Sequence, residues 1–432
     1  MKTVLALVLL AAPPAALASV AAEIRVRALT SGPSHHYFGY IGQCLTIPWS
    51  GDGRHVLALE TDFQDRMPGA GDAARVGVID TRDGNRFRVV DRSLGWNPQQ
   101  GTMFYWNPAA PDTQFFFNDR DPATGKVFTV LFDLTRGPKG GRVREYRFGD
   151  TPVANGGVAA RGGFFLALNY ARLARLRPVT GYKDAADWTT GVTAPEDDGI
   201  HRVDIATGAR RLIVSYAQLK EKLRGLDARL EERHLFINHT LINRDGDRIY
   251  FYCRADFENN PTGRLNVPFT VRTDGSELTA HAQFIGGHPD WEFGARIIGS
   301  ADDQQVIYDT ATRQIVARLG GREVFPNPGG DIAMSPDGEW LVNGNRAGGE
   351  NRYTFLHRRS GRILRSPPLP IGEWVSGDLR LDPAPCWNRT SDAVVVPALA
   401  ADGTRQMFVL ELPQGSTQSV RVSPAPSGPV VR

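Results

Sequence analysis

The chain has 432 residues, of which 41% are apolar, 46 are glycine and 29 are proline, and its formal net charge is +3. The apolar content is that of a globular protein and excludes wholesale disorder, while the glycine and proline content indicates many turns. The 50 basic side chains are balanced by 47 acidic ones. This balance excludes a nucleic-acid-binding protein that depends on a basic excess gathered on one face.

Residues 1–18 have the features of a signal peptide. Lys2 precedes an apolar run at residues 4–10, and an alanine-rich segment ends in a small-residue cleavage site at Ala18. A membrane anchor is the alternative, but the run is far shorter than the roughly 20 residues that span a bilayer. We therefore expect an exported protein, periplasmic or secreted, without a membrane span. Export permits one disulfide, Cys44 with Cys386, although small buried thiols are the favoured interpretation.

Seven strand–turn–strand segments recur along the chain, each with apolar residues at every second position around a turn that tolerates positive φ. They begin at Val76, Thr129, His201, Pro268, Gln305, Tyr353 and Met407. A second strand–turn–strand motif precedes each of them, and its copies begin at Ile47, Gln99, Val158, His239, His288, Asp331 and Ala384. Two hairpins per unit predict an all-β fold, a single seven-bladed β-propeller of four-stranded antiparallel blades over residues 19–422, with a C-terminal tail at 423–432. The alternative is a β-sandwich, but a sandwich gives no reason for the same pair of hairpins to recur seven times.

Two segments break this pattern. Residues 217–235 are charged and have helical spacing, which predicts one short helical insertion. Residues 171–199 form a long polar excursion, which in a compact fold is either a functional lid or a loose loop.

The starts of the innermost strands of a propeller converge on one central channel, so residues at these positions are candidates for a site. Four of the nine histidines fall at such positions, namely His35, His36, His239 and His288. Asp331 and Ala384 hold the corresponding place in blades 6 and 7, and Gln99 and Gln100 lie there in blade 2. A single histidine at a strand start is usually structural, but several converging on one channel favour a functional site.

Several motifs at these positions resemble the oligogalacturonate lyases. They are HHYFGYIGQC from His35, NHTLINRDGDRIYFYCR from Asn238, GGHPDWE from Gly286, GGDIAMSPDGEWLV from Gly329 and PAPCWNRTSD from Pro383. The resemblance extends over nearly the whole mature sequence. It implies a propeller that cleaves uronic-acid-containing oligosaccharides by β-elimination, with manganese in its central funnel.

The resemblance also implies a metal site, which this chain retains only in part. The family's blade-5 histidine matches His288, whereas its blade-6 histidine falls on Asp331 and one blade-7 histidine falls on Asp382. Carboxylates suit hard cations, so His288, Asp331 and Asp382 are candidate ligands for Mn²⁺ or Ca²⁺. A funnel without metal is the alternative. Arg244 lies beside Asn243, the position of the family's catalytic arginine.

β-Elimination beside a uronate carboxylate requires a group that neutralises the carboxylate, a base and an acid. His239 is the first candidate for the base because imidazole titrates near neutral pH, and His36 is a further catalytic candidate. The guanidinium groups of Arg254 and Arg172 match a carboxylate. Tyr40 or Tyr170 is a candidate acid. The candidate substrate-binding residues are His35, Gln99, Gln100, Tyr170, Arg244 and Trp291.

The sequence therefore predicts an exported carbohydrate-active enzyme, a polysaccharide lyase whose partner is an acidic oligosaccharide or polysaccharide, with no nucleic-acid partner. The alternative is a non-catalytic TolB-like propeller that binds a glycan or a protein in the cell envelope. Hydrolysis by paired carboxylates has weaker support, because no glutamate falls at the strand starts.

Overall fold

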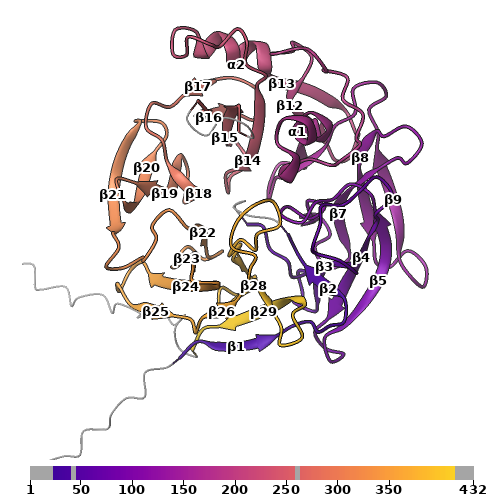
Figure 1. The fold of residues 1–432 in the computed structure, drawn as a ribbon, viewed down its shortest axis with the longest axis vertical. Coiled ribbons are helices and arrows are strands. Elements are labelled where there is room, and N and C mark those ends of the chain that lie inside the picture. The colour runs from indigo at the N-terminus through magenta and orange to yellow at the C-terminus, as the bar shows by residue number, and fades with distance from the viewer. Residues whose placement is uncertain (1–22, 40–44, 258–262, 414–432) are drawn as a thin grey trace, which may run out of the picture.

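The structure is a computed structural model that describes residues 23–39, 45–257 and 263–413. Seven antiparallel sheets surround a central axis, which confirms the predicted seven-bladed β-propeller (Figure 1). The leader at 1–18, the tail at 423–432, Tyr40 and Cys44 lie outside the described residues. Cys253 and Cys386 are both buried. Among the described residues, no helix has the length and apolar character needed to cross a membrane.

In blades 1 to 6 the order of strands in the sheet follows the order in the sequence, from the innermost strand outward (Figure 1). Blade 1 comprises β2 (His35–Tyr37), β3 (His55–Thr61), β4 (Ala74–Asp80) and β5 (Arg86–Ser93). Blade 2 comprises β6 (Tyr105–Trp106), β7 (Gln114–Arg120), β8 (Val127–Asp133) and β9 (Gly141–Tyr146). Blade 3 comprises β10 (Ala154–Val158), β11 (Phe164–Leu168), β12 (Gly199–Asp204) and β13 (Arg210–Ser215).

The next three blades follow the same plan. Blade 4 comprises β14 (Phe236–Ile242), β15 (Arg248–Ala255), β16 (Leu265–Arg272) and β17 (Thr279–Ala280). Blade 5 comprises β18 (Gly286–Trp291), β19 (Arg296–Ala301), β20 (Gln304–Asp309) and β21 (Gln314–Gly320). Blade 6 comprises β22 (Asp331–Met334), β23 (Trp340–Ala347), β24 (Glu350–His357) and β25 (Ile363–Arg365), and β26 (Leu369–Pro370) pairs with β24.

Blade 7 joins the two ends of the chain. It comprises β27 (Cys386–Trp387), β28 (Ala393–Leu399), β29 (Arg405–Glu411) and, as the outermost strand, β1 (Arg25–Ala28). The sequence predicted that the segment after the Met407 strand would complete this blade. Instead β1 pairs with β29 in the register Arg25 with Glu411, because an N-terminal strand that closes the ring leaves no open edge. Residues 414–422 lie outside the described residues.

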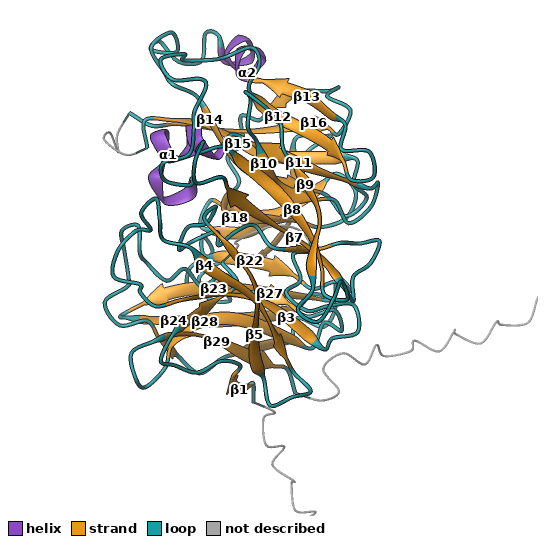
Figure 2. Ribbon diagram, turned by 90° about the vertical axis from the view of Figure 1, so that its right-hand side faces the viewer, coloured by secondary structure: helices purple, strands orange, loops and turns teal. Residues whose placement is uncertain are grey.

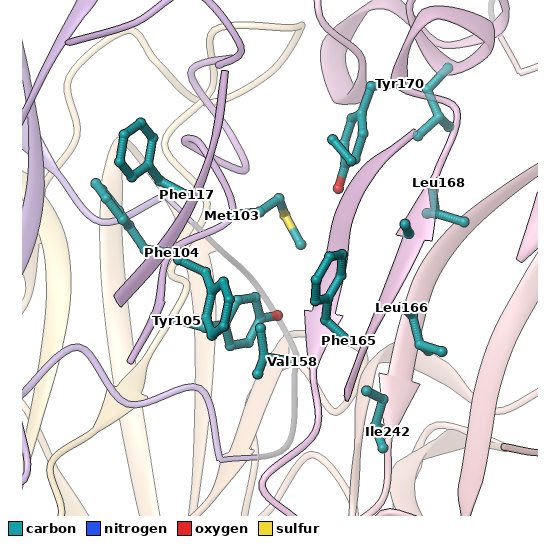
Figure 3. Packing of buried hydrophobic residues seen from close by; sticks show 14 of the residues in the cluster. Met103, Phe104, Tyr105, Phe117, Val158, Phe165, Leu166, Leu168, Tyr170 and Ile242 are labelled. Atoms are coloured by element: carbon teal, nitrogen blue, oxygen red, sulfur yellow. The ribbon is translucent and has the colours of Figure 1, made fainter. Parts of the chain in front are cut away.

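Tryptophans on the inner side of three blades link neighbouring blades. Trp106 Nε1 donates to Pro48 O at 2.7 Å, Trp291 Nε1 to Leu241 O at 2.8 Å, and Trp387 Nε1 to Ala333 O at 3.0 Å. In each case the acceptor belongs to the preceding blade or the segment leading into it. Figure 3 shows the accompanying apolar packing between blades 2 and 3, where Tyr105 faces Phe165. The core therefore lies between the faces of adjacent sheets.

Two short helices lie outside the sheets, and α1 projects on one face of the propeller (Figure 2). The predicted helix at 217–235 is shorter than expected: α2 spans Tyr216–Leu223 and begins with a capping box between Ser215 and Gln218. It ends there because Gly225 has φ +82°, a conformation incompatible with a continuing helix. The excursion at 171–199 contains an unpredicted helix, α1 (Tyr170–Leu176).

We expect the closure of blade 7 to contribute strongly to stability. Ile24, just before β1, is 5% exposed and packs in one cluster with Trp387 and Val394. Ile24→Ala removes buried methyl groups and should lower the free energy of unfolding by about 2–5 kcal/mol. Val316→Ala is the matched control, because Val316 is 49% exposed, and should change it by about 0.5 kcal/mol at most. Urea unfolding measures both, and equal effects would contradict the closure.

Candidate functional site

A cavity of about 380 Å³, here called the funnel cavity, opens among blades 4, 5 and 6 and the loop before blade 7. That loop lies near the central axis in Figure 1. The charged side chains in the lining are Arg254, His288, Asp331, Arg346, Arg380 and Asp382. The structure therefore brings the three predicted metal ligands and one predicted catalytic arginine to one cavity.

His239 and His288 are placed by the same local distortion of two inner strands. The antiparallel register slips between Asn238 and Leu241 in β14, and between Gly286 and Asp290 in β18. At these bulges His239 has φ 60° and His288 has φ 50°. A bulge re-aims a side chain, and a non-glycine residue at positive φ costs roughly 1–2 kcal/mol. The result is that the centroids of the two imidazole rings lie 5.2 Å apart.

His288 and Asp331 form an ion pair across blades 5 and 6. His288 Nδ1 lies 2.5 Å from Asp331 Oδ1, and Asp331 Oδ2 accepts a hydrogen bond from the backbone N–H of Ala384 at 2.9 Å. Burial opposes a charge on His288, but the neighbouring Asp331 carboxylate raises the pKa of His288 above its ordinary value. Burial likewise opposes the charge on Asp331, yet His288 keeps the pKa of that carboxyl below its usual range. The pair favours an imidazolium facing a carboxylate.

His239 is held in the opposite protonation state. Burial, followed by the positive charges of His288 and Arg254, lowers the pKa of His239 well below 6.5. Its side chain is half-buried beside His288 and is not part of the lining of the funnel cavity itself. Asn238 Oδ1 accepts from the His239 backbone N–H at 3.0 Å and from Gln100 Nε2 at 3.5 Å. The neutral imidazole of His239 thus stands next to a cationic one.

Three arginines give the funnel cavity an excess of positive charge. Burial lowers the pKa of Arg254 to about 10, which leaves it a cation at neutral pH. Its Nε donates to Asn266 Oδ1 at 2.9 Å, and its guanidinium lies 4.5 Å from the ring centroid of Tyr252. Arg346 Nη1 and Arg380 Nε both donate to Asp382 Oδ1, at 2.7 and 2.9 Å.

The predicted metal ligands do not fit a divalent cation in this arrangement. Two guanidinium groups share Oδ1 of Asp382, and Asp331 engages Nδ1 of His288. Oδ2 of Asp382 has no hydrogen-bond partner among the described residues. A cation bound at Asp382 would face the charges of Arg346 and Arg380 at short range. Within the described part of the chain, no three histidine, cysteine, aspartate or glutamate side chains come together as a metal-binding group. Manganese or calcium therefore has no matching donor set at this cavity.

The excursion holds two of the predicted residues away from the funnel cavity. Arg172 is 0% exposed and donates to three backbone carbonyls and to Thr189 Oγ1. Tyr170 is buried, donates to Asn155 O at 2.9 Å and stacks on Tyr182 with centroids 4.3 Å apart. These contacts anchor the excursion to the propeller, and neither side chain lines the funnel cavity.

Of the candidate residues in blades 1 and 2, His35, His36, Gln99 and Gln100 do not line the funnel cavity. His36 is buried between Gln406 and Glu60, with its ring nitrogens 3.1 and 3.0 Å from their side-chain oxygens. His35 Nδ1 accepts from the backbone N–H of Arg405 at 3.0 Å. Gln99 is the link to the funnel cavity, because its Oε1 accepts from Arg380 Nη2 at 3.2 Å.

Two further predicted binding residues belong to the packing of blades 4 to 6. Arg244 donates to the carbonyls of Ser335 and Pro336 at 2.9 and 2.8 Å. Trp291 is 1% exposed, and its indole N–H donates the hydrogen bond to Leu241 O that links blades 4 and 5. Neither lines the funnel cavity.

Sequence reasoning missed Arg346 and Arg380. Arg346 is the penultimate residue of β23, and Arg380 lies two residues before Asp382. The short spacing of Arg380 and Asp382 is the only local signal, and it is weak because such pairs are common on protein surfaces. The position of Arg346 depends on the pairing of blade 6 with the loop before blade 7.

Comparisons with known proteins agree with the fold. No protein-family model matches the chain, and the search among curated proteins found no relative. Among solved structures, an oligogalacturonate lyase in complex with manganese aligns with a TM-score of 0.53 at 12% identity, covering 91% of this chain and 95% of that one. Likeness at such low identity shows the fold alone. The chain is thus a β-propeller similar in fold to that lyase.

Propellers of the TolB type are also similar. TolB from Acinetobacter baumannii aligns with a TM-score of 0.38 at 12% identity, covering 81% of this chain and 78% of that one. A putative TolB from Agrobacterium tumefaciens aligns with a TM-score of 0.39 at 15% identity, covering 90% of this chain and 99% of that one.

Proposed function

We propose that this chain is an exported carbohydrate-active enzyme that binds a uronic-acid-containing oligosaccharide at the funnel cavity and cleaves it by β-elimination. The observation that carries the proposal is the pair of imidazoles, 5.2 Å apart, whose pKa values are displaced in opposite directions beside a cationic cavity. Environments that separate the pKa values of two neighbouring groups are typical of a base and an acid. The oligogalacturonate lyase of similar fold acts, by its name, on a substrate of this class.

The two imidazoles divide the proton transfers between them. His239 is neutral, and its ring lies 5.2 Å from that of His288, which lines the cavity. It takes the C5 proton of a uronate that reaches past His288, and the electron pair left at C5 forms a double bond to C4. The bond between C4 and the leaving oxygen breaks, and His288 gives that oxygen its proton. Asp331 holds the imidazolium of His288 in place until then. No oxidant or reductant is needed, and solvent exchange restores both imidazoles.

This division predicts the pH dependence of the reaction. The base must be unprotonated, so activity falls as pH drops through the pKa of His239, which lies well below 6.5. The acid must be protonated, so activity also falls as pH rises through the pKa of His288, which lies above 6.5. We expect a bell-shaped profile of kcat/KM between these limits. Asp331→Asn should move the alkaline limb to lower pH, and an acid limb at or above 6.5 would contradict the assignment of His239.

The reaction itself is tested by its product. The unsaturated uronate absorbs ultraviolet light, so oligosaccharides of galacturonate, mannuronate and glucuronate can each be assayed directly. An increase in absorbance with at least one of them supports the proposal. No increase with any of the three would refute the lyase and leave the non-catalytic propeller as the function.

A further inference from the structure

The charges of the funnel cavity do not cancel. The carboxylate of Asp331 is matched by His288, and Asp382 alone faces both Arg346 and Arg380. Arg254 makes no ion pair with any residue in the described ranges, and its hydrogen bond to Asn266 involves a neutral amide. The lining therefore carries an excess of about two positive charges over the carboxylates that it contains, which favours an anionic ligand.

Two of these guanidinium groups retain donors for a ligand. Within the described chain, Arg254 uses only Nε and Arg346 uses only Nη1 in side-chain hydrogen bonds. The Arg346 side chain is 31% exposed. Arg380, by contrast, is bound through all three of its nitrogens, to Asp382, Gly377 and Gln99. Arg254 and Arg346 thus stand ready to bind, while Arg380 and Asp382 fix the position of Arg346.

We propose that Arg254 and Arg346 bind the uronate carboxylate directly and neutralise it in place of a divalent cation. This inference rests on the proposed function, because it assigns the group that makes the C5 proton acidic. A guanidinium fork matches the two oxygens of a carboxylate and keeps its charge at every working pH. Oδ1 of Asp382 is engaged with Arg346 and Arg380, and Nδ1 of His288 with Asp331. A cation at the remaining oxygen of Asp382 would lie beside two guanidinium charges. Arg380 and Asp382 act as positioning residues.

Calorimetry with the full chain tests this site without relying on turnover. The protein is treated with chelator and titrated with trigalacturonate, trimannuronate and triglucuronate, in wild type and in His239→Asn so that cleavage does not consume the probe. The methyl ester of the tightest-binding probe removes the charge alone. We expect binding in chelator, and about 10- to 100-fold weaker binding for the ester and for Arg346→Gln.

Matched variants separate the site from folding. Arg352→Gln, on the adjacent strand β24 and paired with Glu350, should bind as wild type does. Arg346→Lys keeps the charge but loses the fork, so its affinity should lie between wild type and Arg346→Gln. Near-ultraviolet circular dichroism checks that each variant is folded. If Arg346→Gln does not fold, the affinity of Arg254→Gln is measured in its place.

Three results would overturn the inference: no binding of any probe in chelator, a gain of about tenfold or more with Mn²⁺, or unchanged affinity in both Arg346→Gln and Arg254→Gln. Failure of the proposed function looks different. Binding in chelator without elimination would support the arginine site and refute the lyase. Elimination that requires Mn²⁺ would support the lyase and refute the arginine site.

Discussion

Replacement of His239 by asparagine is expected to lower kcat/KM for β-elimination by about 10²–10⁴-fold, the range that general base catalysis contributes. Asparagine has no group that accepts the C5 proton. It tolerates positive φ better than most residues, so the bulge in β14 at φ 60° should persist. The variant should therefore keep the stability and ligand affinity of the wild type while losing turnover. Ultraviolet absorbance for the rate and calorimetry for affinity measure the two effects separately.

His357→Asn is the matched control for this variant. His357 is the last residue of β24, the third strand of blade 6 counted from the channel. Its Nδ1 lies 2.7 Å from Ser360 Oγ. The His357→Asn variant should turn over substrate at the wild-type rate. If His239→Asn retained wild-type activity, or if His357→Asn lost as much, His239 would not be the base.

Replacement of Arg172 by methionine is expected to produce the largest loss of stability, about 3–5 kcal/mol in the free energy of unfolding. The guanidinium donates to the carbonyls of Leu235, Val192 and Thr193 at 2.7, 3.1 and 2.7 Å. Methionine would take the donor from the buried carbonyl of Leu235 and remove the bonds to Val192 and Thr193, of which Thr193 O keeps the backbone N–H of Leu235. A buried group left without its partner costs about 1–3 kcal/mol. The contact of Arg172 with the ring of Tyr216, at 4.7 Å, would be lost as well.

This variant also distinguishes an anchoring role from the carboxylate-binding role that the sequence suggested for Arg172. Urea unfolding should show the loss, and the protein that remains folded should bind uronate probes with wild-type affinity. Arg161→Met is the matched control, because the Arg161 side chain is 75% exposed, and its stability should be near that of the wild type. A variant that was stable but did not bind would place Arg172 in the binding site instead.

The architecture was predictable because it is repeated. Alternating apolar residues around a short polar turn recur seven times, and each copy independently predicts two strands of a blade. The closure by β1 was not predictable in this way, since a four-residue strand, RVRA, carries no repeat signal. The end of α2 at Leu223 was missed because the charged residues that follow have helical spacing, while Gly225 at φ +82° ends the helix.

The site was predictable in part for the same reason. Repeat alignment placed His239 and His288 at equivalent strand starts, and the structure brings their rings together. The bulges that turn both rings toward each other have no sequence signal beyond the positions themselves. Arg346 and Arg380 depend on tertiary pairing with Asp382, and the burial of Tyr170 and Arg172 depends on how the excursion folds back. Contacts between blades therefore decide which polar residues reach the channel.

Elimination by the metal-stripped protein tests the assignment of the funnel cavity as a metal-independent lyase site most directly. Chelator-treated wild type is incubated at neutral pH with the three uronate trisaccharides, and the absorbance of the unsaturated product is followed with and without added Mn²⁺. If Arg254 and Arg346 neutralise the carboxylate, product should form with at least one trisaccharide, at a rate that Mn²⁺ does not increase. No product with any of them, or product only after Mn²⁺ is added, would contradict this assignment.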